Sequence, residues 1–318
     1  MRNIIKFLTI ALLAVFVLAA CGGNDTSSNE ENTENDGKIK VITTFTLLED
    51  IVKQIGGEYV ETYNLVPVGT DPHEYEPLPQ DIKETEDADV LFFNGLNLEG
   101  GDGGWFTKLT EATGQDDAII FEVSEGVDPM YLSSEDGTEK EVNPHSFIDP
   151  NVGMIMAENI KDALIEISPD NKDKIEENAQ AYLTTLKEMD EQYKTRIGEI
   201  PEKDRILVTS ERAYQYMADR YDLKEGFIWE VDTEENGTPE QITTLVNFIK
   251  EEDPPVLFVE SNVDPRPMET VSNESGVDIF EDKLYSDEIG ALGEEADTYV
   301  KYLQYNIDKI HTGLTREK

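Results

Sequence analysis

Two of the three histidines in the chain lie in closely similar tripeptides, Asp71-Pro72-His73 and Asn143-Pro144-His145. In each tripeptide a proline fixes the backbone just before the imidazole and biases the preceding residue toward extended geometry. Such a loop can direct an imidazole toward a ligand. The local pattern alone favours two loop histidines without a function, so the rest of the chain must decide whether that interpretation stands.

Apolar runs that predict buried strands alternate with helical patterns through two stretches of the chain. In the first stretch we expect strands at 38–45, 59–68, 90–93 and 118–123, with helices at 47–55, 81–88, 105–112 and 151–167. In the second stretch we expect strands at 205–209, 226–231, 255–259 and 277–280, with helices at 213–221, from 238, at 268–275 and at 296–314. This alternation is typical of parallel sheets covered by helices. Ligands of such sheets lie beyond the C-terminal ends of the strands, where His73 falls.

A stretch without glycine or proline separates the two halves. From Asp170 to Ile197 apolar residues recur at three- and four-residue steps, which predicts one helix of about 28 residues, roughly 42 Å long. Ser168 is expected to cap it, with Pro169 in the first helical position. The sequence thus predicts an α/β fold. It has two Rossmann-like lobes with parallel sheets, 38–167 and 201–318, joined by a rigid helix at 168–200.

The first 20 residues have the pattern of a signal peptide, with basic residues before an apolar run too short for a comfortable membrane span. The sequence Leu18-Ala19-Ala20-Cys21 is typical of bacterial lipoproteins, in which Cys21 is acylated and becomes the first mature residue. It is the only cysteine, which excludes an intrachain disulfide and a multi-cysteine metal site. Residues 21–37 are expected to be this lipidated cysteine and a disordered tether. The combination predicts a protein anchored to the membrane without spanning it.

The formal charge of −43 results from 69 acidic against 26 basic residues. Such a surface argues against nucleic acid as a partner, because phosphate contacts need lysine and arginine. It attracts cations only weakly and without specificity. A solvated acidic surface accounts for most of these carboxylates, and a saline or alkaline habitat is a weak further hypothesis.

Four residues follow strands or loops on the expected cleft side, His73 and His145 in the first lobe and Glu211 and Asp287 in the second. Two imidazoles and two carboxylates are softer than the all-oxygen shells of calcium and harder than the cysteine-rich shells of structural zinc. The set suits manganese(II), with zinc(II) and iron(II) as competitors, although affinity order alone favours zinc. Spacing alone supports the carboxylate pair weakly, because acidic residues are abundant.

Several motifs in order resemble those of the metal-binding lipoproteins of bacterial ABC importers for manganese and zinc, the surface-adhesin-like or cluster A-I solute-binding proteins. The resemblance runs from about Lys38 to His311 and is greatest for the manganese-type branch. The matching segments are Gly69–Pro77, Asn94–Glu99, Pro144-His145 with Asp149-Pro150, Thr209-Ser210-Glu211, Ile228–Pro239, and Phe258–Ser261 with Arg266-Pro267-Met268.

The resemblance implies that His73, His145, Glu211 and Asp287 bind the metal. It implies a monomeric receptor on the outer face of the bacterial cytoplasmic membrane, anchored through Cys21. Such a receptor is not an enzyme. It carries manganese(II), or alternatively zinc(II), to a membrane permease. An adhesin with a structural metal and a metal-dependent hydrolase remain alternatives, but no motif provides the general base that a hydrolase needs.

Three positions depart from the family's pattern. Asn143 stands for the usual aspartate, Ser146-Phe147 for Ala-Trp, and Ser286-Asp287-Glu288 for Thr-Asp-Ser. The last departure leaves Asp282 and Glu288 as rivals of Asp287 for the fourth ligand. The zinc branch usually has a histidine-rich loop and a third histidine ligand. This chain has no such loop and has Glu211 at that histidine's position, which favours manganese.

The remaining notable side chains have simpler interpretations. His311 is expected on the outer face of the closing helix, away from any metal. Trp105 and Trp229 are expected in the core. Tyr75 fits the lining of the cleft and the packing of the core equally well.

Overall fold

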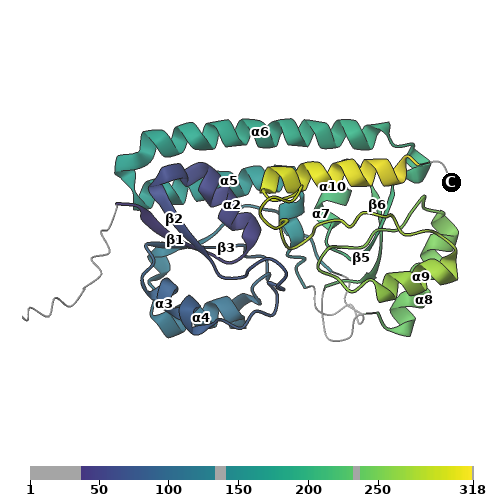
Figure 1. The fold of residues 1–318 in the computed structure, drawn as a ribbon, viewed down its shortest axis with the longest axis horizontal. Coiled ribbons are helices and arrows are strands. Elements are labelled where there is room, and N and C mark those ends of the chain that lie inside the picture. Colours follow the sequence, from purple (N-terminus) through teal and green to yellow (C-terminus); the bar gives the residue numbers. More distant parts are fainter. Residues whose placement is uncertain (1–36, 133–140, 232–236, 317–318) are drawn as a thin grey trace, which may run out of the picture. The chain divides into compact units, whose positions relative to one another are not determined.

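The computed structural model describes residues 37–132, 141–231 and 237–316 (Figure 1). The predicted signal peptide, Cys21 and nearly all of the predicted tether lie outside the described residues. We call residues 38–167 the first half of the fold and residues 201–318 the second half.

The first half contains a four-stranded parallel sheet in the order β2-β1-β3-β4. Its strands are β1 (Ile39–Thr43), β2 (Val60–Asn64), β3 (Val90–Phe93) and β4 (Ile120–Glu122). Its helices are α2 (Thr46–Gly56), α3 (Pro79–Glu86), α4 (Trp105–Thr113) and α5 (Pro150–Ile167). Helices α2 and α5 lie on one face of the sheet, and α3 and α4 lie on the other (Figure 1). The predicted alternation is confirmed here; β3 has the predicted bounds, and the other three strands are shorter than expected.

The second half contains a parallel pair, β5 (Ile206–Glu211) and β6 (Lys224–Trp229). Its helices are α7 (Gln215–Tyr221), α8 (Pro239–Glu252), α9 (Arg266–Ser275) and α10 (Tyr299–Leu314). A capping box opens α8, since the side chains of Thr238 and Gln241 each accept a hydrogen bond from the other residue's backbone amide.

The prediction of strands at 255–259 and 277–280 is wrong, because neither segment forms a regular strand. The two segments are joined by a single parallel bridge, Leu257 to Ile279. A second bridge, Glu260 to Leu284, follows just beyond them. The Phe258 amide still donates to the Val208 carbonyl at 2.8 Å, so the first segment lies beside β5. Two prolines precede Val256, and a proline has no amide hydrogen to contribute to a ladder.

The long helix α6 spans Lys172–Glu199, 28 residues, and runs over both halves (Figure 1). Its predicted start is wrong by three residues. Pro169–Asn171 forms a separate 3-10 turn, and Ser168 makes no side-chain capping bond to it. The helix packs against α2 and α5 of the first half and against α7 and α10 of the second.

One apolar core continues from the first half through α6 into the second half, and a smaller core lies against α8 and α9. Buried tyrosines reinforce this continuity. Tyr193 of α6 donates to the Leu303 carbonyl at 2.8 Å, and Tyr299 of α10 donates to the Phe147 carbonyl of the first half at 2.6 Å. Wide separation of the halves would expose side chains of this shared core, and each large apolar side chain exposed costs about 1.5–3 kcal/mol. Such a separation is therefore unfavourable.

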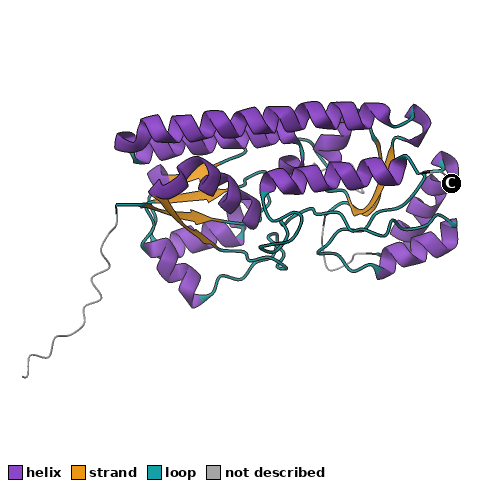
Figure 2. Ribbon diagram, turned by 45° about the horizontal axis from the view of Figure 1, so that its top comes forward, coloured by secondary structure: helices purple, strands orange, loops and turns teal. Residues whose placement is uncertain are grey.

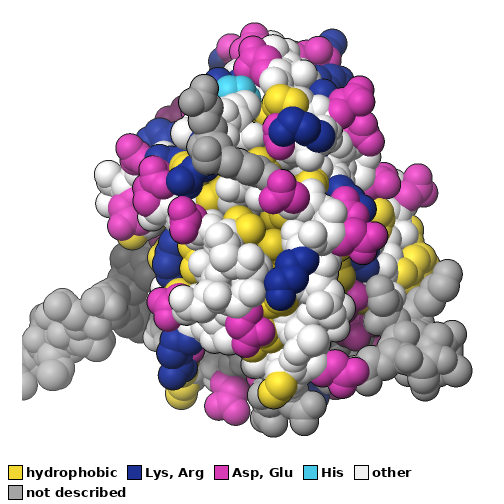
Figure 3. All heavy atoms as spheres, turned by 90° about the vertical axis from the view of Figure 1, so that its right-hand side faces the viewer, with side chains coloured by type: hydrophobic (Ala, Val, Ile, Leu, Met, Phe, Trp, Pro, Cys, Tyr) yellow, Lys and Arg dark blue, Asp and Glu magenta, His cyan; other side chains and the backbone are white. Residues whose placement is uncertain are grey.

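Loops fill the region between the two sheets (Figure 2). At the end of the molecule that carries α8 and α9, acidic side chains are scattered among basic and apolar ones (Figure 3). No helix in the described ranges is long and apolar enough to cross a membrane.

Glu99 joins the ends of two strands of the first sheet from a buried position. Its carboxylate accepts hydrogen bonds from the Thr44 hydroxyl at 2.6 Å, the Asn94 amide at 2.7 Å and the Gly95 amide at 3.2 Å. Burial raises the pKa of Glu99 to about 7, although these hydrogen bonds act in the opposite direction. The folded protein therefore binds a proton at Glu99 more tightly than an unfolded chain does.

We predict that Glu99 makes the metal-free protein less stable at pH 7 than at pH 5. A raised carboxyl pKa gives stability that is present at low pH and lost as the pH rises through about 7. A shift of this size corresponds to about 3 kcal/mol over the full titration. In urea unfolding, the free energy of unfolding should differ less between the two pH values in Glu99→Gln than in wild type. The exposed Glu111→Gln variant is the control. Equal differences in wild type and Glu99→Gln would contradict the prediction.

Candidate metal centre

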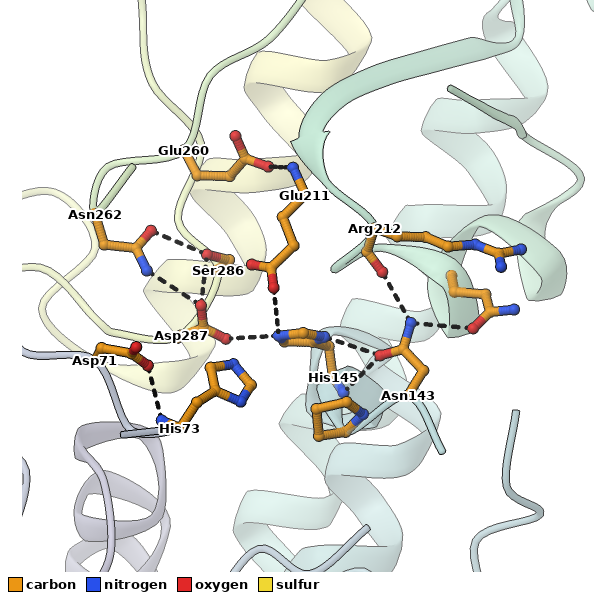
Figure 4. Close-up of polar contacts among 12 residues, drawn as sticks. Asp71, His73, Asn143, His145, Glu211, Arg212, Glu260, Asn262, Ser286 and Asp287 are labelled. Carbon is orange, nitrogen blue, oxygen red and sulfur yellow. Dashed lines mark hydrogen bonds and ion pairs between the residues drawn. The ribbon is translucent and has the colours of Figure 1, made fainter. Parts of the chain in front are cut away.

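Two histidines and one aspartate from distant parts of the chain bring their side chains together (Figure 4). His73, His145 and Asp287 each offer one ligand atom, and these atoms lie within 4.8 Å of one another. His145 Nε2 is 3.1 Å from Asp287 Oδ1, and the two imidazole rings are 5.2 Å apart. Apart from this contact between His145 and Asp287, buried Nε2 of each histidine and Oδ1 of Asp287 have no hydrogen-bond partner in the described part of the chain. Such atoms need a ligand to compensate for their loss of water.

Glu211 lies beside this group without belonging to its tightest set. It is fully buried at the end of β5, and its Oε1 is 3.7 Å from His145 Nε2. The buried Glu260 carboxylate accepts hydrogen bonds from the amides of Ser210 at 3.1 Å and Glu211 at 2.9 Å. Glu260 therefore fixes the strand end from which the Glu211 side chain extends toward the histidines (Figure 4).

Asn143 orients the His145 ring. His145 Nδ1 is 2.8 Å from Asn143 Oδ1. The Asn143 amide nitrogen donates to the Arg212 carbonyl at 2.8 Å and to Gln215 Oε1 at 3.0 Å, so the amide oxygen must face the imidazole. The imidazole therefore carries a hydrogen on Nδ1, and the Nε2 lone pair is directed at the cluster.

The similarity of the two histidine tripeptides has a structural cause. Asp71 Oδ1 accepts the His73 amide at 2.7 Å, and Asn143 Oδ1 accepts the His145 amide at 3.0 Å. In both loops an Asx side chain closes a short turn over the intervening proline. After Pro144, residues His145–Ile148 form a 3-10 turn that leads into α5.

The His73 loop is held by aromatic residues of the first half. Trp105 Nε1 donates to the Pro72 carbonyl at 2.8 Å, and the Tyr75 ring packs edge-on against Trp105 at 5.2 Å. The Tyr75 hydroxyl donates to Asp81 at 2.7 Å. Trp105 is buried as predicted, and half-buried Tyr75 supports the loop through Trp105.

The structure places Asp287, and neither of its two rivals, beside the histidines. Asn262 Nδ2 donates to Asp287 Oδ2 at 3.1 Å, which leaves Oδ1 directed at the cluster. Asp282 instead pairs with Lys309 at 2.7 Å. Glu288 accepts hydrogen bonds from the Gly69 amide and the Ser261 hydroxyl.

The electrostatics of the cluster favour the ionisation states that bind metal. Burial lowers the pKa of the His73 imidazole, although the neighbouring Asp287 carboxylate acts in the opposite direction. Burial alone would raise the pKa of Asp287, but His145 and His73 hold it well below its usual range. A neutral imidazole and an ionised carboxylate are the forms that coordinate a cation.

The remaining predicted positions lie elsewhere. His311 lies away from the cluster, but its predicted position on the outer face of α10 is wrong: the side chain faces the end of α6, with 2.9 Å between His311 Nε2 and a carboxylate oxygen of Glu199. Trp229 is buried in the second-half core, as predicted. Sequence reasoning did not identify Asn143, Asn262 and Glu260 as supporting groups. Only the position of Asn143 directly before Pro144-His145 offered any indication.

The fold has two parallel sheets and a helix that spans both halves, and a buried cluster of imidazoles and a carboxylate lies between the sheets. These features are those of a metal-binding protein with two halves. The model of the family "ZnuA: Zinc-uptake complex component A periplasmic" matches residues 41–313. The chain belongs to this family of substrate-binding proteins.

Relatives match over almost their whole length. The metal ABC transporter substrate-binding lipoprotein SsaB of Streptococcus sanguinis is 44% identical, covering 98% of each chain. The manganese ABC transporter substrate-binding lipoprotein ScaA of Streptococcus gordonii is 42% identical, covering 98% of this chain and 99% of its own. This protein is accordingly a substrate-binding component of an ABC transporter and not an enzyme.

Solved structures of both metal types share the fold. An Mn-bound periplasmic metal binding protein from Candidatus Liberibacter asiaticus is 28% identical with a TM-score of 0.77, covering 87% of this chain and all of that one. The periplasmic zinc binding protein TroA from Treponema pallidum is 28% identical with a TM-score of 0.79, covering 88% of this chain and all of that one. The fold itself therefore does not distinguish manganese from zinc.

We predict that Asn143→Ala weakens binding of a divalent transition metal about 10–100-fold, because the His145 ring loses the acceptor that fixes its proton. Titration calorimetry measures the affinity, and ¹⁵N spectra of the imidazole nitrogens report the lost preference for an Nδ1 proton. Asn143→Asp keeps an acceptor and should bind within a few-fold of wild type. The control is Asn273→Ala, on the exposed face of α9. Wild-type affinity and ring spectra in Asn143→Ala would refute the role of Asn143.

Proposed function

We propose that this protein is an extracytoplasmic, lipid-anchored receptor that binds manganese(II) between its two halves and delivers it to an ABC permease. The observation that carries the proposal is the set of buried ligand atoms of His73, His145 and Asp287, within 4.8 Å of one another. A site of this size fits a single ion. The proposal agrees with relatives that are named manganese ABC transporter substrate-binding lipoproteins.

The donor set is compatible with manganese as the cargo. The cluster contains imidazole nitrogens and carboxylate oxygens, and the chain's only cysteine, Cys21, lies far from it in sequence. Manganese(II) accepts such a mixed set, whereas zinc(II) binds it more tightly by intrinsic affinity order. Zinc(II) is the alternative cargo, and it is the metal named for the family and for TroA.

Glu211 is the proposed fourth ligand. Its Oε1 lies 3.7 Å from His145 Nε2, near the group formed by the other three residues. The glutamate side chain has more rotatable bonds than the aspartate, so Glu211 can approach an ion while Glu260 keeps its backbone fixed. The cargo would then be held by two residues from each half of the chain.

The anchor and the partner follow from the sequence pattern and the relatives. Cys21 would carry the lipid on the outer face of the cytoplasmic membrane, and residues up to 37 would form the tether. The relatives named as lipoproteins support this placement. We propose that the receptor acts as a monomer and that a permease of the same transporter accepts the ion.

We predict that His73→Ala, His145→Ala, Glu211→Ala and Asp287→Ala each weaken manganese binding at least about 100-fold, since removing one ligand leaves other buried groups uncompensated. Calorimetry with metal-free protein measures the loss. Asp282→Ala is the matched control, because Asp282 pairs with Lys309 instead.

The identity of the cargo can be tested on the same samples. Elemental analysis of wild-type protein purified without added metal, followed by competition between manganese and zinc, should identify manganese as a bound metal. The four alanine variants should lose that manganese. Failure of wild type to bind manganese, or an effect of Asp282→Ala equal to that of Asp287→Ala, would overturn the proposal.

We predict that manganese affinity falls when the pH is lowered from 7.5 to 5. Protons compete with the metal for imidazole nitrogens, so affinity decreases as the pH falls through the histidine pKa. Because burial lowers the pKa of His73, the decrease at this residue should begin below the ordinary histidine value of about 6.5. Equal calorimetric affinities at pH 5 and pH 7.5 would contradict coordination by the two histidines.

A further inference from the structure

Glu288, next to the proposed ligand Asp287, connects the two halves of the fold. One carboxylate oxygen accepts a hydrogen bond from the Gly69 amide of the first half, and the other accepts one from the Ser261 hydroxyl of the second half at 3.0 Å. The side chain is nearly buried, with 8% of its surface exposed. Gly69 lies four residues before His73 in the same loop. A single carboxylate thus joins the loop of one proposed ligand to the loop of another.

A second contact between the halves follows immediately. The Ile289 amide donates to the Thr46 hydroxyl at the start of α2, with a distance of 3.1 Å. Residues 287–289 therefore comprise a proposed metal ligand followed by two consecutive bonds to the first half. Separating His73 from Asp287 would require this segment to move away from the first half.

The His73 loop cannot simply follow that movement. Trp105 holds the Pro72 carbonyl, and Trp105 itself is buried in the first half. Asn262 holds Asp287 on the side of the second half. Because each loop is fixed to its own half, opening of the site must break the bond between Gly69 and Glu288.

We propose that Glu288 is a clasp that holds the His73 loop against the Asp287 loop and slows the release of the bound ion. This inference rests on the proposed function. A serine side chain in this position would be too short to connect Gly69 and Ser261 as Glu288 does. Glu288 would therefore adjust the lifetime of the complex in this chain, as a positioning residue that does not touch the ion.

The clasp interpretation differs from coordination by Glu288 in its predictions. Both carboxylate oxygens of Glu288 accept hydrogen bonds from protein groups. A glutamine keeps an acceptor for the Gly69 amide, so Glu288→Gln should preserve most of a clasp. If Glu288 instead coordinated the ion, Glu288→Gln would lose the charge of a metal ligand and would impair binding as severely as Asp287→Asn does.

The test measures release of manganese(II) into excess chelator by stopped flow. Glu288→Ser should release the ion roughly ten-fold faster than wild type, because a hydrogen bond to a charged group is lost before the ion leaves. Glu288→Gln should fall between the two, and association rates should change by less than about two-fold. Glu295→Ser, in an exposed part of the same segment, is the control. Equal release rates in wild type and Glu288→Ser, or Glu288→Gln behaving like Asp287→Asn, would overturn the clasp.

A second measurement does not depend on metal binding. In metal-free protein, hydrogen exchange of the Gly69 amide should be slowed in wild type and accelerated at least about ten-fold in Glu288→Ser, with no change in Glu295→Ser. An unprotected Gly69 amide in wild type would refute the clasp even if manganese binds. Protection at Gly69 without any manganese binding would support the clasp contact and refute the proposed function instead.

Discussion

The metal centre depends on the removal of a few polar atoms from water without giving them protein partners. Apart from the contact between His145 and Asp287, buried Nε2 of His73 and His145 and Oδ1 of Asp287 lack hydrogen bonds among the described residues. Burying such atoms is unfavourable, so each side chain needs other contacts that prevent it from turning away. Asn143 and Asn262 provide those contacts from the side, and Trp105 does so through the backbone of the His73 loop. The supporting hydrogen bonds therefore keep the proposed ligand atoms directed at one point.

The strand and helix order of the first half and the long central helix were predictable because they depend on local apolar periodicity. The strand near Val256 was not predicted correctly, because its form depends on neighbours brought together by folding and on two adjacent prolines. Likewise α6 begins at Lys172, since Pro169 opens a separate turn instead of the helix.

The site shows the same division between local and tertiary information. The repeated Asx-Pro-His tripeptides drew attention to both histidines, because the turn that each forms is local in sequence, but the tripeptides alone did not distinguish a ligand from an ordinary loop histidine. The position of Asp287 beside the histidines, with Asp282 and Glu288 directed elsewhere, depends on which distant groups each carboxylate meets, so the sequence alone could not give it. The orienting role of Asn143 also depends on Arg212 and Gln215, which are about 70 residues away.

The continuity of the apolar core through α6 has a consequence for how a membrane partner recognises the loaded state. In a receptor with two independent lobes, the angle between the lobes can differ between the empty and the loaded state, and a partner can recognise that difference. Here the packing of α6 on both halves, together with the bond from Tyr299 to Phe147, restricts such a rotation. A partner would instead have to recognise small rearrangements of the loops at the mouth of the site, where a few main-chain groups change place. Loading would then be communicated by local surface chemistry and not by molecular shape.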